Sequence, residues 1–221
     1  MSTNWRTNRR EFAARWLGAT SLASLLILLL ALAPFGGRVA AQVPADAVFH
    51  DSHFHLTNYI QEGTDIRDFV AMMGSTIGRS VVFGIPLQQQ WSYQNTGDFA
   101  PTYYLQSDAP LYYYSFTDAH IAMAYLSLSA EEQARLDPMI TGFNPVDMYA
   151  ADHIRRVLET VPGVFSGIGE FTIHTEFVSA KVAGEVASIA NPALDRILDL
   201  AGEVGLVVIL HSDINMPFPK P

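Results

Sequence analysis

The sequence of 221 residues contains no cysteine and few basic side chains. Without cysteine the chain has no disulfide framework and no thiolate to serve as a nucleophile or a metal ligand. It carries 13 lysines and arginines against 22 acidic residues, which gives a net charge of −9 at pH 7. Because an acidic surface repels phosphate backbones, nucleic acid is a poor partner and a small molecule is the expected one.

The N-terminal segment has the features of an export signal. Paired arginines, Arg9 and Arg10, are followed by Phe12 and then by residues 16–37, which carry no ionisable side chain. This arrangement resembles a twin-arginine export signal. The resemblance implies a periplasmic or exported protein that meets the export machinery through this segment.

Two outcomes are open for residues 1–41. Val39 and Ala41 occupy the small-residue positions of a cleavage site, so we expect cleavage before Gln42. The alternative is an uncleaved inner-membrane anchor, because residues 16–37 are long enough to span a bilayer. In both cases the remaining 180 residues form the folded domain, with eight basic and 21 acidic side chains and a net charge of −13. That length suffices for one ordinary core.

Beyond residue 41, short apolar runs alternate with longer helical patterns. Strand-like runs lie at 46–55, 80–86, 138–145, 164–173 and 206–213, and helices are expected over 65–73, 118–128, 148–161 and 192–204. Strands that are apolar on both faces and separated by helices indicate a parallel sheet covered by helices. The pattern is compatible with a barrel and with a doubly wound open sheet.

Residues that start and stop helices support these assignments. Ser129 and Glu132 have the spacing of a capping box, and Asp147 is placed to cap the helix that follows it. Asn191 precedes a proline at the start of the last helix, and Gly205 is expected to end it.

Residues of metal-ligand type end three of the five expected strands. His53 and His55 are two positions apart, so on a strand both project from the same face. Glu170 ends the fourth strand and His211 the fifth. Singly, each has a plainer explanation: a chance His-x-His pair, a helix-capping glutamate, a hydrogen-bonded histidine at the rim. Together they predict a site for Zn²⁺, with Mn²⁺ or Fe²⁺ as alternatives, holding one ion or two bridged by Glu170.

The segments "DSHFHL", "GIGEF" and "VVILH" together resemble the amidohydrolase superfamily of metal-dependent hydrolases, in particular its TatD-like and amidohydrolase-related branches. The resemblance implies an α/β fold of the (β/α)₈ TIM-barrel type. It implies that His53 and His55 bind the metal from the first strand, Glu170 from the fourth and His211 from the fifth. The reaction implied is attack of a metal-activated water on a carbonyl (amide, ester or lactone) or phosphoryl centre.

The family pattern continues with a histidine after a sixth strand and a catalytic aspartate after an eighth, and neither has a counterpart here. We therefore expect about five β/α units over 42–221, the N-terminal part of a longer hydrolase barrel, with no catalytic residue assigned in it. Asp213 is an alternative acid/base, although a loop residue is the simpler interpretation. The rival functions are a decarboxylase that uses the same metal site and a non-catalytic, envelope-tethered module that binds a ligand or metal.

A 29-residue segment over 88–116 is rich in tyrosine and nearly free of charge. Loops of this length are usually functional, so we expect a lid or a substrate wall, with a rim loop packed on its neighbours as the alternative. Trp91 in this segment and His174, four residues after Glu170, are the candidate substrate-binding residues. His50 lies nearer the start of its strand and is expected to be structural.

Overall fold

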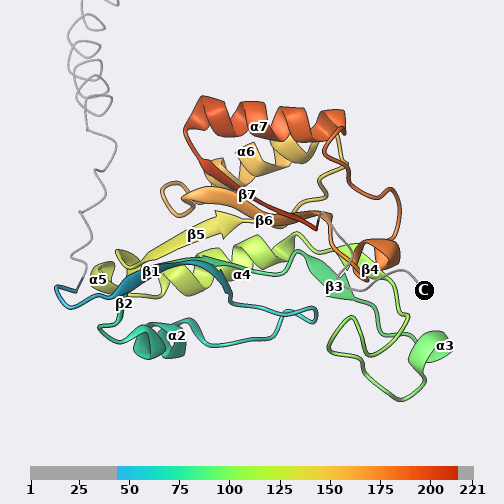
Figure 1. The fold of residues 1–221 in the computed structure, drawn as a ribbon, viewed down its shortest axis with the longest axis horizontal. Coiled ribbons are helices and arrows are strands. Elements are labelled where there is room, and N and C mark those ends of the chain that lie inside the picture. The colour runs from blue at the N-terminus through green and yellow to red at the C-terminus, as the bar shows by residue number, and fades with distance from the viewer. Residues whose placement is uncertain (1–43, 214–221) are drawn as a thin grey trace, which may run out of the picture. The chain divides into compact units, whose positions relative to one another are not determined.

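A five-stranded parallel sheet curled into a half-barrel forms the centre of the fold (Figure 1). The strand order is β1-β2-β5-β6-β7, and every neighbouring pair is parallel. The strands are β1 (Phe49–His55), β2 (Ile77–Phe83), β5 (Leu136–Ile140), β6 (Gly167–His174) and β7 (Val207–Ser212). This sheet confirms the predicted parallel α/β architecture.

The computed structural model describes residues 44–213, all within the unit Ala40–Pro221. The predicted export segment over 1–41 lies outside the described residues. Over 44–213, no helix combines the length and the apolar character that crossing a membrane requires.

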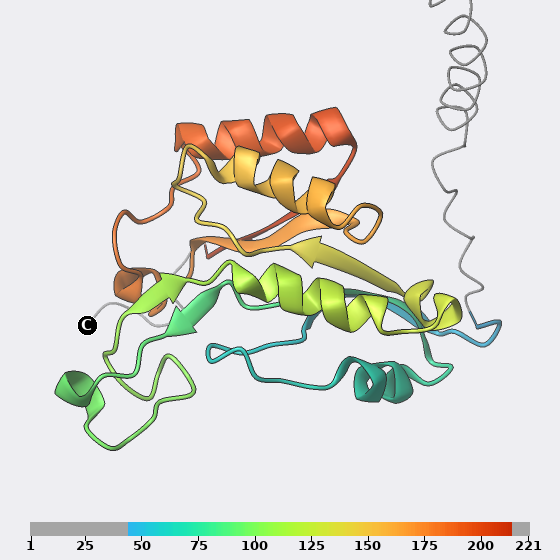
Figure 2. The same ribbon diagram turned by 180° about the vertical axis from the view of Figure 1, so that it is seen from behind.

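Helices cover the sheet, with α6 and α7 beside β6 and β7 and with α4 and α2 beside β5 and β2 (Figures 1 and 2). The helices are α2 (Ile66–Met73), α4 (Phe116–Leu126), α5 (Ala130–Gln133), α6 (Ala150–Thr160) and α7 (Pro192–Val204). Their buried faces and the strands share one apolar core, in which Val82, Ile140 and Ile168 are fully buried together with Ile121 and Ile154 of the helices. Because burial of apolar side chains is the main favourable term in folding, this core holds the helices against the sheet.

Three helix-end predictions are confirmed. Ser129 and Glu132 form the reciprocal hydrogen bonds of a capping box at α5. Asn191 accepts a hydrogen bond from the backbone N–H of Ala193 at the start of α7, and Gly205 ends that helix with a left-handed φ of 70°. Glycine adopts this conformation at little cost.

The predicted cap at Asp147 is wrong. Helix α6 has Tyr149 at its N-cap position. The Asp147 carboxylate instead accepts the backbone N–H of Tyr149 at 2.9 Å. Aspartate stabilises turns in the same way as it caps helices, so the two roles share one sequence signal.

The second and third strands begin and end earlier than predicted. Strand β2 starts at Ile77 and so includes Arg79, which breaks the apolar pattern and pairs with Asp137 of β5 at 2.5 Å across the sheet. Strand β5 ends before Thr141 because the buried Asp118 carboxylate accepts the next backbone N–H groups. A charged pair inside a sheet and a buried carboxylate from another element leave no periodic signal in the sequence.

The segment predicted as one long loop contains regular structure. It forms a two-stranded antiparallel sheet and a one-turn helix, and a 3₁₀ turn after β6 packs beside it: β3 (Leu87–Gln89), α3 (Tyr93–Thr96), β4 (Leu111–Tyr113) and η1 (Ser179–Lys181). Leu87, Leu111 and Val178 form a second, small apolar core here. The long segment is therefore anchored beyond the main sheet and is no open loop.

Candidate metal centre

His53 and His55 project from one face of β1. Phe54 between them points to the opposite face, where its ring stacks on Phe69 of α2 with a centroid separation of 3.8 Å. This alternation is the property of a strand that places both imidazoles on the same side. Their Nε2 atoms lie 3.1 Å apart. The predicted pair is thus formed by strand geometry, with Phe54 securing it to the core.

Glu170 of β6 brings a carboxylate to this pair. Its Oε2 atom lies 3.4 Å from His53 Nε2 and 3.1 Å from His55 Nε2. In the sheet, β2 and β5 separate β1 from β6, so the residues meet because the sheet is curled. We call His53, His55 and Glu170 the ligand cluster, since one ligand atom from each lies within 4.8 Å of the others.

The distances within the ligand cluster fit a metal ion. Zn²⁺ binds histidine nitrogen and carboxylate oxygen at about 2.0–2.1 Å, so neighbouring ligand atoms of a tetrahedral site are about 3.3 Å apart. The three separations in the cluster are 3.1, 3.1 and 3.4 Å. Imidazole and carboxylate are the ligands that Zn²⁺, Mn²⁺ and Fe²⁺ accept. The donor set therefore has the spacing and the chemistry for one divalent ion.

The charge state of Glu170 suits the same role. Burial leaves the residue 9% exposed and by itself raises the pKa of the carboxyl group. The hydrogen bond with His55 and the charges of His53, His55 and His211 act in the opposite direction and together hold the pKa of Glu170 below its ordinary value. The carboxylate is consequently ionised at neutral pH, as a metal ligand must be.

His211 reaches Glu170 from the other side. Its Nδ1 atom lies 2.9 Å from Glu170 Oε1, and its Nε2 atom lies 3.2 Å from Asp213 Oδ1. The structure thus places the predicted ligand His211 beside the ligand cluster, within a Glu170–His211–Asp213 chain. Asp213 also accepts the backbone N–H of Glu176, and this bond, with His211 nearby, lowers the pKa of the Asp213 carboxyl group.

Aromatic rings that the sequence did not single out lie near the ligand cluster. Phe83, fully buried at the end of β2, contacts the His53 and His55 rings edge-on at centroid separations of 5.1 and 4.7 Å. Tyr59 stands next to Tyr104, with ring centroids 5.0 Å apart. Burial raises the pKa of Tyr59 well above its ordinary value, and Tyr104 and the Glu170 carboxylate raise it further. Tyr59 remains a neutral hydrogen-bond donor beside the cluster.

The two candidate substrate residues lie in different surroundings. Trp91 is 53% exposed, donates its indole N–H to the Gly97 carbonyl and stacks on Tyr93, so its contacts are local to α3. His174 is the exposed last residue of β6, and its charge contributes to the lowered pKa of Asp213. The structure brings His174 to the site end of the sheet and does not bring Trp91 into contact with the ligand cluster.

The contact that His50 makes is consistent with the structural role predicted for it. Its Nδ1 atom accepts the backbone N–H of Arg79 in the neighbouring strand at 3.0 Å.

Comparisons of the chain with family models, with curated proteins and with solved structures gave no match.

Proposed function

We propose that this chain is the metal-binding part of a hydrolase in which His53, His55 and Glu170 hold a divalent ion, Zn²⁺ in the first place. The observation that supports it is the convergence of three ligand atoms, at the separations of a tetrahedral site, from strands that are not neighbours. Accidental histidine pairs occur within one strand, whereas this cluster requires the curvature of the whole sheet.

The ion would supply two effects: it acidifies water toward neutral pH and it polarises a carbonyl or phosphoryl oxygen. The residues of the chain supply the rest. Glu170 and the two imidazoles would bind the ion, and Phe83 orients both imidazole rings through its edge-on contacts with them. The Asp213 carboxylate, ionised and 3.2 Å from His211 Nε2, is placed to accept a proton at Oδ1.

We further propose a complete fold, a family and a location for this protein. The half-barrel, with His53, His55 and His211 at or near the carboxyl ends of their strands, supports a (β/α)₈ barrel of the amidohydrolase superfamily, whose sites lie at that end. The N-terminal sequence supports export to the periplasm. The substrate class is a small molecule with a carbonyl or phosphoryl centre, and the strongly acidic domain disfavours a polyanion.

The test is metal content. The purified chain is loaded with Zn²⁺, dialysed and analysed by plasma mass spectrometry, alongside the double variant His53→Ala/His55→Ala. The matched control is His120→Ala, which removes an exposed histidine of α4. We expect about one ion per chain in the wild type and the control and less than a tenth of that in the double variant, because two of three ligands are lost.

Turnover is measured on the same samples with p-nitrophenyl acetate and a phosphotriester. Turnover that disappears with the metal supports hydrolysis. Equal metal content in all three proteins would refute the site, and stable metal binding without turnover of either substrate would favour the non-catalytic module.

A further inference from the structure

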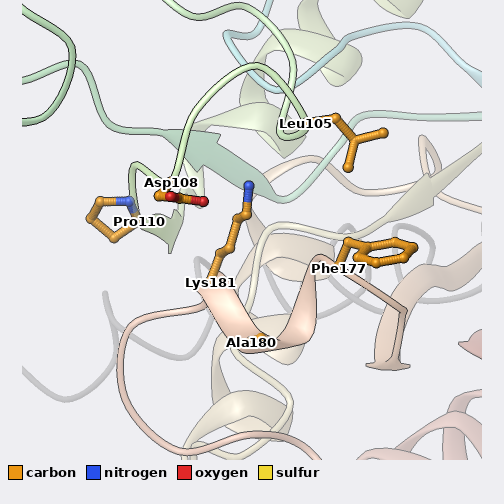
Figure 3. Close-up of a pocket in the computed structure, with 6 residues that line it drawn as sticks. All are labelled: Leu105, Asp108, Pro110, Phe177, Ala180 and Lys181. Carbon is orange, nitrogen blue, oxygen red and sulfur yellow. The ribbon is translucent and has the colours of Figure 1, made fainter. Parts of the chain in front are cut away.

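A second feature at the site end of the molecule is a pocket that no residue of the ligand cluster lines. Its volume is about 580 Å³, in the range of cavities that hold small organic ligands. Its walls come from the long segment and from the segment after β6, which face each other in Figure 3. The lining residues are Leu105, Asp108, Pro110, Phe177, Ala180 and Lys181.

The two walls of the pocket are fixed to each other. Leu111 of β4 forms a parallel bridge with Val182, and the Ala183 backbone N–H donates to the Leu111 carbonyl at 2.9 Å. Leu111 and Val178 are also buried together in the small apolar core. A pocket between two linked walls is formed before any ligand arrives, which reduces the ordering cost of binding.

Lys181 brings a positive charge into the pocket. Its ammonium group donates to the backbone carbonyls of Tyr104 and of Ser107, the latter at 2.6 Å. An ammonium group has three N–H donors, so two carbonyl acceptors leave one for a ligand. In Figure 3 the Lys181 nitrogen points into the space between Asp108 and Leu105.

Asp108 supplies the opposite charge without neutralising Lys181 directly. No ion pair within 4.0 Å joins the two among the described residues, so a donor and an acceptor face the same space separately. Since the charges balance, the polar side of the pocket favours a neutral group with an adjacent acceptor and donor. A carboxylate would satisfy Lys181 but would face the Asp108 carboxylate.

Phe177 supplies an aromatic wall at a conformational cost. Its φ of 60° lies in the left-handed region, which is unfavourable for a bulky residue and concentrates at ligand-binding sites. Phe177 as a whole is 46% exposed, and its ring lies at the pocket opposite Leu105 in Figure 3. The backbone therefore holds an apolar surface at the pocket instead of burying it.

We propose that this pocket binds a neutral, partly apolar amide, with the amide carbonyl toward Lys181, the amide N–H toward Asp108 and the hydrocarbon part against Phe177 and Leu105. The inference rests on the proposed function, because it makes the pocket the binding site for a non-reacting amide group of the substrate, away from the metal. Tyr104 connects the two sites: its carbonyl accepts from Lys181, while its ring contacts Tyr59 beside Glu170.

The test uses three related probes: the neutral N-acetyl-phenylalaninamide, the anionic N-acetyl-phenylalanine and the cationic phenylalaninamide. Binding to the full chain, freed of metal by chelation, is measured by calorimetry. We expect the neutral probe to bind at least fivefold more tightly than either charged one. The variant Asp108→Asn should reverse the order for the anion, because it leaves Lys181 unopposed.

Two variants test the walls. Lys181→Met keeps the length of the side chain without its donors, and Phe177→Asn removes the ring with a residue that tolerates a left-handed φ. Each variant should weaken the affinity for the neutral probe about tenfold. The matched control Phe99→Asn removes another exposed phenylalanine of the long segment, outside the pocket lining, and should change nothing.

Equal affinity of wild type and both wall variants, an anion bound more tightly than the neutral probe by the wild type, or no saturable binding would overturn the proposal. Zn²⁺ content of reloaded samples separates this failure from that of the hydrolase proposal. Metal binding without probe binding refutes the pocket alone. Probe binding without metal binding refutes the hydrolase, and with it the substrate role of the pocket.

Discussion

Asp118 makes the stability of this domain depend on pH in an unusual direction. The side chain is 2% exposed, and its carboxylate accepts the backbone N–H groups of Thr141 and Gly142 at 2.8 and 3.0 Å. Burial raises the pKa of Asp118 from 3.8 to about 7, although those hydrogen bonds act to lower it. The folded state therefore binds a proton between about pH 4 and pH 7 that the unfolded chain has already released.

The sign and the size of the effect follow from proton linkage. Where the folded state binds more protons than the unfolded state, the free energy of unfolding falls as pH rises. A pKa difference of about three pH units corresponds to about 4 kcal/mol, since each unit is worth about 1.4 kcal/mol. The loss is complete once pH exceeds the folded-state pKa of about 7.

The perturbation is Asp118→Asn, which keeps one acceptor oxygen for the two backbone N–H groups and removes the titration. The free energy of unfolding is measured by urea titration from pH 4.5 to pH 8 for both proteins. The wild type should lose about 3 kcal/mol relative to the variant across this range, since it begins at pH 4.5, above the unfolded-state pKa of 3.8. The difference between the two proteins cancels other titrating groups, such as His153, whose burial lowers its pKa. Parallel curves for the two proteins would refute the reasoning.

Two further predictions concern the sheet. Gly169→Ala should lower the free energy of unfolding by about 3–5 kcal/mol, because a Cβ would lie 2.2 Å from the Ile209 carbonyl oxygen and the residue has a φ of 121°. Urea titration measures this loss, with Gly202→Ala, which has open space around it, as the control. Equal stability of the two variants would contradict the steric explanation. Val207→Lys should slow self-association at high protein concentration, because Val207 is 66% exposed on the edge strand β7 and a charged side chain disfavours pairing between edge strands. Light scattering measures this, with Val186→Lys, which lies outside the sheet, as the control. Equal scattering from the two variants would show that the edge strand is not the cause.

The ligand cluster was accessible from the sequence because strand geometry is periodic. Two histidines at alternate positions share a face in any strand. The prediction that Glu170 ends its strand is wrong, because β6 continues past it to His174, but the run around it was correctly predicted to be a strand. Parallel strands separated by helices place their carboxyl ends at one edge. The proximity of β1 to β6 could not be derived from that pattern, because it depends on the curvature of the sheet and not on any local sequence signal.

Other contributors to the site have no periodic signal. Phe83 resembles an ordinary core residue at the end of an apolar run, and only its position below two imidazoles gives it a role. Tyr59 follows β1 in an irregular segment. Lys181 acquires its orientation from two carbonyls more than 70 residues away. Long-range contacts of this kind are set by tertiary packing, which composition and spacing do not encode.

The curvature of the sheet also determines when the ligand cluster can exist during folding. His55 and Glu170 are far apart in sequence, and β2 and β5 lie between their strands in the sheet. The cluster therefore links the two outer strands of a curved group of four, β1, β2, β5 and β6. No single hairpin or βαβ unit assembles it, and a nascent chain holds the complete cluster only after β6 has docked. An ion bound there would join β1 directly to β6, and would so stabilise the curved sheet against opening at β2 or β5.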